Sequence, residues 1–400
     1  MRICLIALLA FIPLSCAAED GAPQDNAERL LDLVEQDMQG LLTSDMAVGA
    51  AIGVIDGDGA AFRTYGVMSR KTGKPVTTKT LFEIGSVTKS VTGLLLADSV
   101  ERGEVAYMTA IGELLPADVV KDMGPAKDIS LLSLATYRSG LPAHVIPDAI
   151  NPPTPKDYDQ AIVNGTAEDV YAFLKTYDPR PTAGDWLYSN GAFQVLGHVL
   201  GLKAGKSYAE LLEERITSKL GMDDTVLFMP RPEDNENVPE GYVRFDERGI
   251  QQLLNRGRYG GYFYNGFSGA DGGIVSTIED MAKYAKALLD SDHISPDPWS
   301  RTLAKSIAPY APPSHLDAKP WLPTVSGKRV YASSLGWNYG VHDDHVWVLK
   351  GGGTVHFKCF VIVSQTMDRA VVVLSNTGIY DQEIDPFMPI VKKVMTAALE

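Results

Sequence analysis

The sequence predicts an α+β fold, with an antiparallel sheet flanked by helices and a mainly helical lobe inserted between the strands. Two observations favour this class. Short runs rich in β-branched residues lie near both ends of the chain, whereas the long middle part carries apolar residues at helical spacing. Because strands at the two ends need partners, we expect both ends to contribute to one sheet.

The expected strands lie at the two ends of the chain, and the expected helices lie mostly between them. The strands are Val48 to Ile55, Ala61 to Tyr65, Val346 to Leu349, Phe360 to Val363 and Val371 to Leu374. The helices are Val87 to Arg102, Glu168 to Thr176, Phe193 to Lys203, Tyr208 to Lys219, Ile278 to Leu289 and Pro389 to Leu399. We expect a sheet lobe from residues 19–85 and 290–400 and a helical lobe from residues 86–289.

Residues 1–18 are typical of an export signal. A positively charged start precedes the apolar run Ile3 to Leu14, which is too short to span a bilayer, and small residues suited to cleavage follow. We therefore expect a mature chain that starts near Glu19, has no transmembrane segment and is periplasmic or secreted. Lipid attachment at Cys16 is the alternative, and Pro13 argues against it.

Composition describes an ordinary globular chain with an acidic surface. With 400 residues, 45% of them hydrophobic, the chain is long enough for one large core or two medium cores. A formal net charge of -14 disfavours nucleic acid or an anionic membrane as partner, so a small-molecule or peptide substrate fits better. The sequence does not indicate the oligomeric state. Once the signal is removed only Cys359 remains, and we expect it to be a core residue rather than a reactive thiol.

Ser86 and Lys89 form the most informative pair in the chain. Residues three apart on a helix lie on one face, so Lys89 can reach the Ser86 hydroxyl within one turn. The apolar run that follows predicts a buried helix, and burial together with the helix dipole favours a neutral amine that can accept a proton. The pair therefore predicts a nucleophile and its base, although a capping serine followed by a surface lysine would have the same spacing.

Two further segments carry groups suited to the same chemistry. Tyr188 and Asn190 lie two residues apart just before a predicted helix, where a phenol can relay protons and an amide can orient both Lys89 and a substrate. Lys350 ends a β-rich run and is followed by three glycines, which allow a ligand to lie along the strand edge beside a cation. A core tyrosine with a turn asparagine, and an ordinary glycine-rich turn, are the alternatives.

The order Ser-x-x-Lys, Tyr-x-Asn and Lys-x-Gly resembles the class C β-lactamase and penicillin-binding-protein family. Within it the chain is most similar to the D-alanyl-D-alanine carboxypeptidase-like and family VIII esterase branches. The resemblance implies a β-lactamase/transpeptidase-like fold, one hydrolase domain over residues 19–400, and no cofactor or metal. It also implies catalytic and substrate-binding residues, respectively Ser86, Lys89 and Tyr188, and Asn190, Lys350, Gly352 and Gly353.

Three departures from the family pattern bear on the substrate. Gly351 replaces the usual threonine, so a hydroxyl that would help to hold a substrate carboxylate is missing. Strand alternation would place Thr354, His356 and Lys358 on one face, either lining the pocket or facing solvent. Tyr137 and Arg138 replace residues that are typically histidine and threonine in relatives, in a segment that we interpret as structural.

Other candidate sites are weaker. The run 342–345, His-Asp-Asp-His, has ligand-type side chains but fits a turn before a strand, so we do not expect a metal there. His144 and His198 have no partners that would predict a Ser-His-Asp triad. Segments 145–160 and 228–270 are rich in Pro, Gly and aromatic residues and either wall a substrate pocket or form long surface loops.

These residues predict a serine acyl hydrolase that works through a covalent acyl-enzyme on amide, β-lactam or ester carbonyls. A penicillin-recognising cell-wall peptidase or a β-lactamase-like hydrolase is the leading interpretation. A family VIII-type carboxylesterase is the alternative with the same machinery. A penicillin-binding sensor that is acylated without turnover is the alternative of another class.

Overall fold

The computed structural model describes residues 23–150, 165–245, 249–251, 267, 269–310, 333–342, 345–379 and 385–398. The predicted export signal and Cys16 lie outside these residues. So do residues 343–344 of the predicted turn and large parts of the two predicted pocket walls. These predictions are therefore not tested by the structure.

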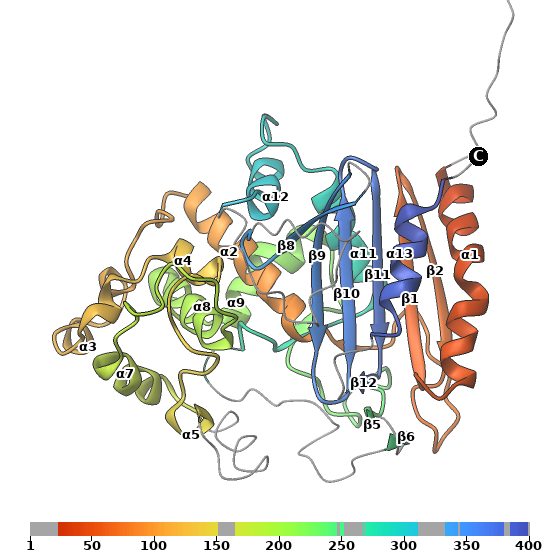
Figure 1. The fold of residues 1–400 in the computed structure, drawn as a ribbon, viewed down its shortest axis with the longest axis horizontal. Helices are drawn as coiled ribbons and strands as arrows, with labels where there is room; N and C mark the ends of the chain where they lie inside the picture. The colour runs from red at the N-terminus through yellow and green to blue at the C-terminus, as the bar shows by residue number, and fades with distance from the viewer. Residues whose placement is uncertain are drawn as a thin grey trace, which may run out of the picture.

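A six-stranded antiparallel sheet joins the two ends of the chain, as the sequence predicts. Its strand order is β2-β1-β11-β10-β9-β8, and Figure 1 shows the late, blue strands beside the early, orange ones. The strands are β1 (Gly49–Asp56), β2 (Gly59–Gly66), β8 (Asn338–His342), β9 (His345–Gly353), β10 (Lys358–Ser364) and β11 (Arg369–Ser375). The two ends meet where β1 pairs with β11.

Helices bury both faces of this sheet. The terminal helices α1 (Pro23–Thr43) and α13 (Met388–Thr396) lie side by side on one face, where alternate residues such as Ile52 and Val373 form one core. The intervening residues of the same strands, such as Ala51 and Val372, belong to a larger core with α2 (Thr88–Glu101) and α11 (Ile278–Leu289). The period of two along each strand produces this division.

The middle of the chain forms the predicted helical part (Figure 1). Its helices are α3 (Ala117–Val120), α4 (Leu131–Ala135), α5 (Pro147–Ile150), α7 (Ala167–Thr176), α8 (Asn190–Ala204), α9 (Tyr208–Leu212) and α10 (Ser218–Leu220), with α12 (Pro298–Ile307) later in the chain. The helix predicted over residues 208–219 is interrupted, because a π turn at Glu213–Thr217 separates α9 from α10. Since α11 packs on β1, β10 and β11, we propose that the helical lobe ends before α11.

Two small sheets complete the described structure. The strands β3 (Phe82–Glu83), β4 (Val226–Leu227) and β7 (Ile274–Ser276) form one of them, and it leads directly into α2. The strands β5 (Tyr242–Phe245), β6 (Gly249–Gln251) and β12 (Thr377–Ile379) form the other. The first of these sheets positions the start of α2.

The expected strand face of Thr354, His356 and Lys358 is wrong. β9 ends at Gly353 and β10 begins at Lys358, so residues 354–357 form the turn between two antiparallel neighbours. The Thr354 N–H donates to the Phe357 carbonyl at 3.0 Å across this turn. His356 is buried and Lys358 pairs with Asp385, so the three side chains do not form one row.

Cys359 is a buried residue of β10, as predicted. Burial raises the pKa of its thiol, which disfavours the reactive thiolate. Within the described ranges, no helix has both the length and the apolar character that crossing a bilayer requires. The same ranges contain no cluster of three or more His, Cys, Asp or Glu side chains arranged to hold a metal ion.

Candidate active site

Ser86 and Lys89 meet at the start of α2. Ser86 lies in a 3-10 turn, η1 (Gly85–Val87), between β3 and α2, and Lys89 occupies the first turn of the helix. The Lys89 Nζ donates to the Ser86 Oγ at 3.1 Å and to the Asp271 carbonyl at 2.5 Å. Because Lys89 is fully buried, these oxygens replace the water that its amine would otherwise bind.

Tyr188 completes a contact of three groups. Its Oη lies 2.5 Å from the Ser86 Oγ, and the Lys89 Nζ lies 5.1 Å from the centre of its ring. Ser189 follows it and caps α8 by accepting a hydrogen bond from the Ala192 N–H at 2.9 Å. The cap fixes the point where the chain enters α8 and therefore holds Tyr188 beside Ser86.

The predicted glycine strand lies against the turn that carries Ser86. Gly85 has a φ of 51°, and a Cβ atom there would lie 2.7 Å from the Gly353 nitrogen. A Cβ atom at Gly352 would lie 1.9 Å from the Ile84 carbonyl oxygen. Only glycine permits this approach, so the end of β9 lies directly beside the Ser86 turn.

Asn190 is the first residue of α8, two residues beyond Tyr188. Its backbone N–H donates to the Ala143 carbonyl at 3.0 Å, and the N–H of Gly191 donates to the same oxygen. Among the described residues, its side chain makes no hydrogen bond to Ser86 or Lys89. Asn190 is therefore near the site without the contact to Lys89 that the sequence suggested.

Lys350 reaches the site from β9, but it is not an open cation. It is only 2% exposed, and its Nζ donates to the Tyr137 Oη at 2.5 Å. Burial and the nearby Lys89 hold the pKa of Lys350 well below its usual range. In this structure the Lys350 amine therefore meets Tyr137 instead of an open ligand edge, and its role as a cation for a substrate stays a prediction.

Tyr137 is the main site residue that sequence reasoning missed. Its ring stacks on that of Tyr188, with centroids 5.3 Å apart and planes at 18°, and its hydroxyl binds Lys350. We interpreted its segment as structural. No sequence signal separates this residue from an ordinary core tyrosine, because its contact with Lys350 joins positions 213 residues apart.

His144 is a second residue that the sequence left without a partner. Burial and the nearby Lys89 lower the pKa of its imidazole, which places His144 within electrostatic reach of the site. It follows Ala143, whose carbonyl anchors the start of α8. His144 lies near Lys89 because α2 and the start of α8 come together in the fold.

Accessibility divides the site into two layers. Lys89 and Lys350 are buried, whereas Ser86 and Tyr188 are partly exposed. A substrate can therefore meet the two hydroxyl groups while the two amines act from beneath them. Such an arrangement suits proton transfer to and from a hydroxyl nucleophile.

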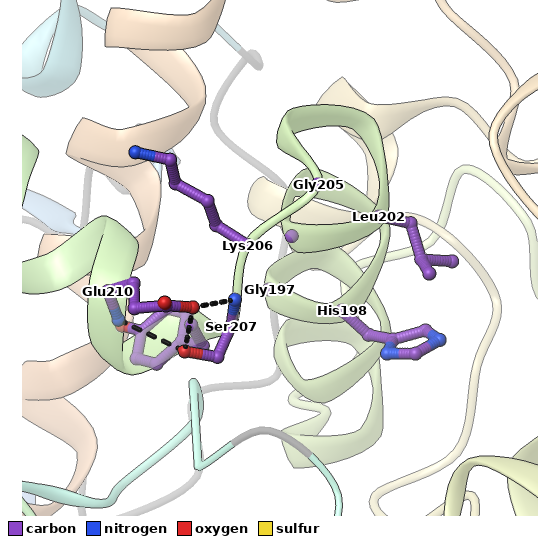
Figure 2. A pocket seen from close by; sticks show the side chains of 9 residues that line it. Gly197, His198, Leu202, Gly205, Lys206, Ser207 and Glu210 are labelled. Atoms are coloured by element: carbon purple, nitrogen blue, oxygen red, sulfur yellow. Dashed lines mark hydrogen bonds between the residues drawn. The ribbon is translucent and has the colours of Figure 1, made fainter.

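A separate hollow of about 460 Å³ lies at the other end of α8 and contains none of the predicted site residues. Figure 2 shows Ser207 and Glu210 joined by hydrogen bonds on one side, while His198 and Leu202 point away on the other. The Ser207 and Glu210 bonds form a capping box for α9. The polar groups of Ser207 and Glu210 that line the hollow therefore cap a helix and take no part in the site around Ser86.

The fold and this arrangement of groups define a serine hydrolase. The family model described as Beta-lactamase matches residues 32–385, so the chain belongs to the beta-lactamase family. It is 29% identical over 287 residues to a beta-lactamase of Escherichia coli K12, covering 71% of this chain and 66% of the relative. It is 28% identical over 290 residues to the D-alanyl-D-alanine-carboxypeptidase/endopeptidase AmpH of the same organism, covering 71% and 70%.

Solved structures confirm the predicted β-lactamase/transpeptidase-like fold. A class C beta-lactamase superposes with a TM-score of 0.72 at 18% identity, over 94% of this chain and 98% of the other. The D-alanine carboxypeptidase AmpC from Burkholderia cenocepacia superposes with a TM-score of 0.70 at 22% identity, over 92% and 99%. At these identities the likeness concerns the fold.

Proposed function

We propose that the protein hydrolyses amide, β-lactam or ester carbonyls through an acyl-enzyme on Ser86. The observation that carries the proposal is the contact of Ser86 Oγ with both Tyr188 Oη and Lys89 Nζ. A serine hydroxyl is a weak nucleophile until a neighbouring base accepts its proton. Here two such groups lie within hydrogen-bond distance of one oxygen.

The proposed acylation begins when Ser86 Oγ attacks the carbonyl carbon. The serine proton passes to Lys89 or Tyr188, and the tetrahedral intermediate collapses as Tyr188 returns a proton to the leaving group. In deacylation, water attacks the ester while Tyr188 accepts its proton. Ser86 then recovers a proton, so the site returns to its starting state.

The proposed oxyanion hole consists of the backbone N–H groups of Ser86 and Gly353. The close approach at Gly85 and Gly352 supports this assignment, because it brings the end of β9 to the nucleophile turn. Loss of one such donor typically costs roughly 3–4 kcal/mol of transition-state stabilisation. We further propose that Asn190 and the edge at Gly352 and Gly353 contact the substrate, with Lys350 acting from beneath.

A cell-wall peptidase or β-lactamase-like hydrolase is the leading assignment, and the relatives named above support it. An ester substrate is the second candidate. Gly351 supplies no hydroxyl, and the Lys350 amine binds Tyr137 instead of facing the site opening. A substrate with a carboxylate therefore finds neither of these two groups ready, whereas an ester needs neither.

We also propose that the protein is exported, on the basis of residues 1–18, and that it acts on small-molecule or peptide substrates. Export would bring the mature chain to the compartment where cell-wall peptides and β-lactams occur. Neither nucleic acid nor a cofactor enters the proposed reaction.

The test is a turnover panel on the purified mature protein. Nitrocefin, a D-alanyl-D-alanine peptide and short p-nitrophenyl esters are each compared for wild type, Ser86→Ala and the surface control Ser44→Ala. We expect Ser86→Ala alone to lose turnover, because it lacks the nucleophile. Equal activity of Ser86→Ala would refute the assignment. Turnover of esters alone would favour the esterase, and a single acylation without turnover would favour the sensor.

A further inference from the structure

Tyr137 has a backbone conformation that its neighbours must hold in place. Its φ is 60°, in the left-handed region that is unfavourable for a bulky side chain. The carbonyl of Tyr137 accepts a hydrogen bond from the Leu187 N–H at 2.8 Å. This bond fixes the backbone of Tyr137 beside the residue that precedes Tyr188.

The Tyr137 hydroxyl joins two parts of the site. It accepts a hydrogen bond from the Lys350 Nζ at 2.5 Å and donates to the Gly336 carbonyl at 3.4 Å. Gly336 in turn lies against α2, because a Cβ atom there would be 2.3 Å from the Lys89 carbonyl oxygen. The phenol thus links β9 to the segment that supports the helix carrying Lys89.

The Tyr137 ring holds the neighbouring phenol. It stacks on Tyr188 and packs against Trp186 and Phe193, whose centroids lie 5.5 Å and 5.2 Å away. The Lys350 Nζ lies 5.4 Å from the centre of the Tyr188 ring. One residue therefore contacts both the ring of Tyr188 and the amine of Lys350.

Charge decides what this phenol can do. Burial and the adjacent Tyr188 raise the pKa of Tyr137 well above its usual value, so it stays a neutral phenol and does not act as a base. Its proton is directed to Gly336, and its oxygen is left as an acceptor for Lys350. An acceptor at this position stabilises the protonated form of the Lys350 amine, whereas burial favours the neutral form.

The titratable groups that the described structure places around Tyr188 come from three parts of the fold. They are Lys89 from α2, Lys350 from β9 and Tyr137 after α4, with His144 acted on by Lys89. Both lysines, when charged, favour loss of the Tyr188 proton. The hydrogen bond to Tyr137 sets the position of one of these lysines, Lys350.

We propose, on the basis of the acyl-enzyme function above, that Tyr137 is a positioning residue of the reaction. Its oxygen keeps the Lys350 amine beside Tyr188 and favours the charged form of that amine, and its ring fixes Tyr188 next to Ser86. Through these contacts Tyr137 sets the pH range over which Tyr188 can relay protons.

Tyr137→Phe tests this role, because it keeps the ring and removes the hydroxyl that accepts from Lys350 and donates to Gly336. We expect kcat/KM for a p-nitrophenyl ester at neutral pH to fall roughly tenfold, with KM unchanged. The acid limb of the pH profile should move to higher pH by about one unit, because less positive charge beside Tyr188 disfavours its phenolate form. Tyr107→Phe is the matched control. It also removes a tyrosine hydroxyl, but one that accepts a hydrogen bond from the Tyr310 hydroxyl at 2.9 Å and not from Lys350.

The outcomes separate this inference from the proposed function. If Ser86→Ala is inactive and Tyr137→Phe has the wild-type rate and pH profile, the role of Tyr137 is refuted while the acyl-enzyme stands. A lower rate with an unmoved acid limb would also refute it, because a purely structural defect predicts that result. If Ser86→Ala retains full activity, the proposed function fails.

A second variant covers the case in which Tyr137→Phe does not fold, as judged by a circular dichroism melt. Tyr137→His keeps a ring and a nitrogen that can accept a hydrogen bond from Lys350. We expect it to lie closer to wild type than Tyr137→Leu in the position of the acid limb. The same displacement in both variants would contradict the role of the acceptor.

Discussion

Glu83 offers a stability test that depends on the packing beside the nucleophile turn. It lies in β3, three residues before Ser86, and its side chain is buried. Burial raises the pKa of Glu83 from 4.5 to about 8, and the nearby Thr354 hydroxyl acts in the opposite direction. The folded protein therefore holds a proton that the unfolded chain releases once the pH exceeds about 4.5.

The magnitude follows from this difference in pKa. One pKa unit corresponds to ~1.4 kcal/mol, so the free energy of unfolding should fall by about 5 kcal/mol as the pH rises from 4.5 to about 8. The stabilisation is complete at pH values below the pKa of Glu83 in the unfolded chain. It is lost once the pH reaches the pKa of Glu83 in the folded protein. Glu83→Gln keeps the shape of the side chain but cannot titrate. Its free energy of unfolding therefore lacks this dependence on pH.

Urea unfolding of wild type and Glu83→Gln, at pH values from about 5 to about 8, measures the effect. The stability of the variant relative to wild type should rise by ~1.4 kcal/mol per pH unit over this range. Glu236→Gln, at an exposed position, is the control for the amide substitution itself. Parallel curves for wild type and Glu83→Gln would show that Glu83 is not a buried neutral acid.

Three further variants probe the geometry of the site. Gly352→Ala forces β9 away from the nucleophile turn, and we expect kcat/KM for an ester to fall roughly hundredfold. Gly351→Ala is the control and should have a much smaller effect, because its Cβ atom would meet only the edge of the Phe360 ring at 3.1 Å. Equal effects of the two alanines would contradict the close approach. Lys89→Met should lower kcat roughly a thousandfold in the same assay, because Ser86 loses a proton acceptor, and near-wild-type turnover would exclude that role. Ser189→Ala removes the cap of α8 and should destabilise the protein by about 1 kcal/mol in urea unfolding, whereas an unchanged midpoint would show that the cap contributes nothing.

Much of the fold follows from local patterns in the sequence. The continuous apolar run Val371–Leu374 predicts a strand buried on both faces, and the capping residues Ser189 and Thr277 mark the starts of α8 and α11. The turn at residues 354–357 was missed because its residues continue the strand alternation, and the glycines that precede it, Gly351 to Gly353, were interpreted as a strand edge that binds a ligand. Propensity alone does not locate such a turn.

The sequence predicts one contact of the candidate site and misses others. Ser86 and Lys89 are close in sequence, so helical spacing predicts their contact. The contact of Lys350 with Tyr137 was not predicted, because folding brings the two residues together from 213 positions apart. Burial of that amine is a property of packed layers, and a motif contains no information about it.

A covalent acyl-enzyme on Ser86 is the step on which the proposed function depends, and peptide mapping detects it. The mature protein is incubated with a fluorescent penicillin and with a fluorescent ester-type acylating probe, quenched, digested and analysed by mass spectrometry. We expect a single acylated peptide, modified at Ser86, and no labelling in Ser86→Ala. Acylation at another residue, or labelling that persists in Ser86→Ala, would contradict it.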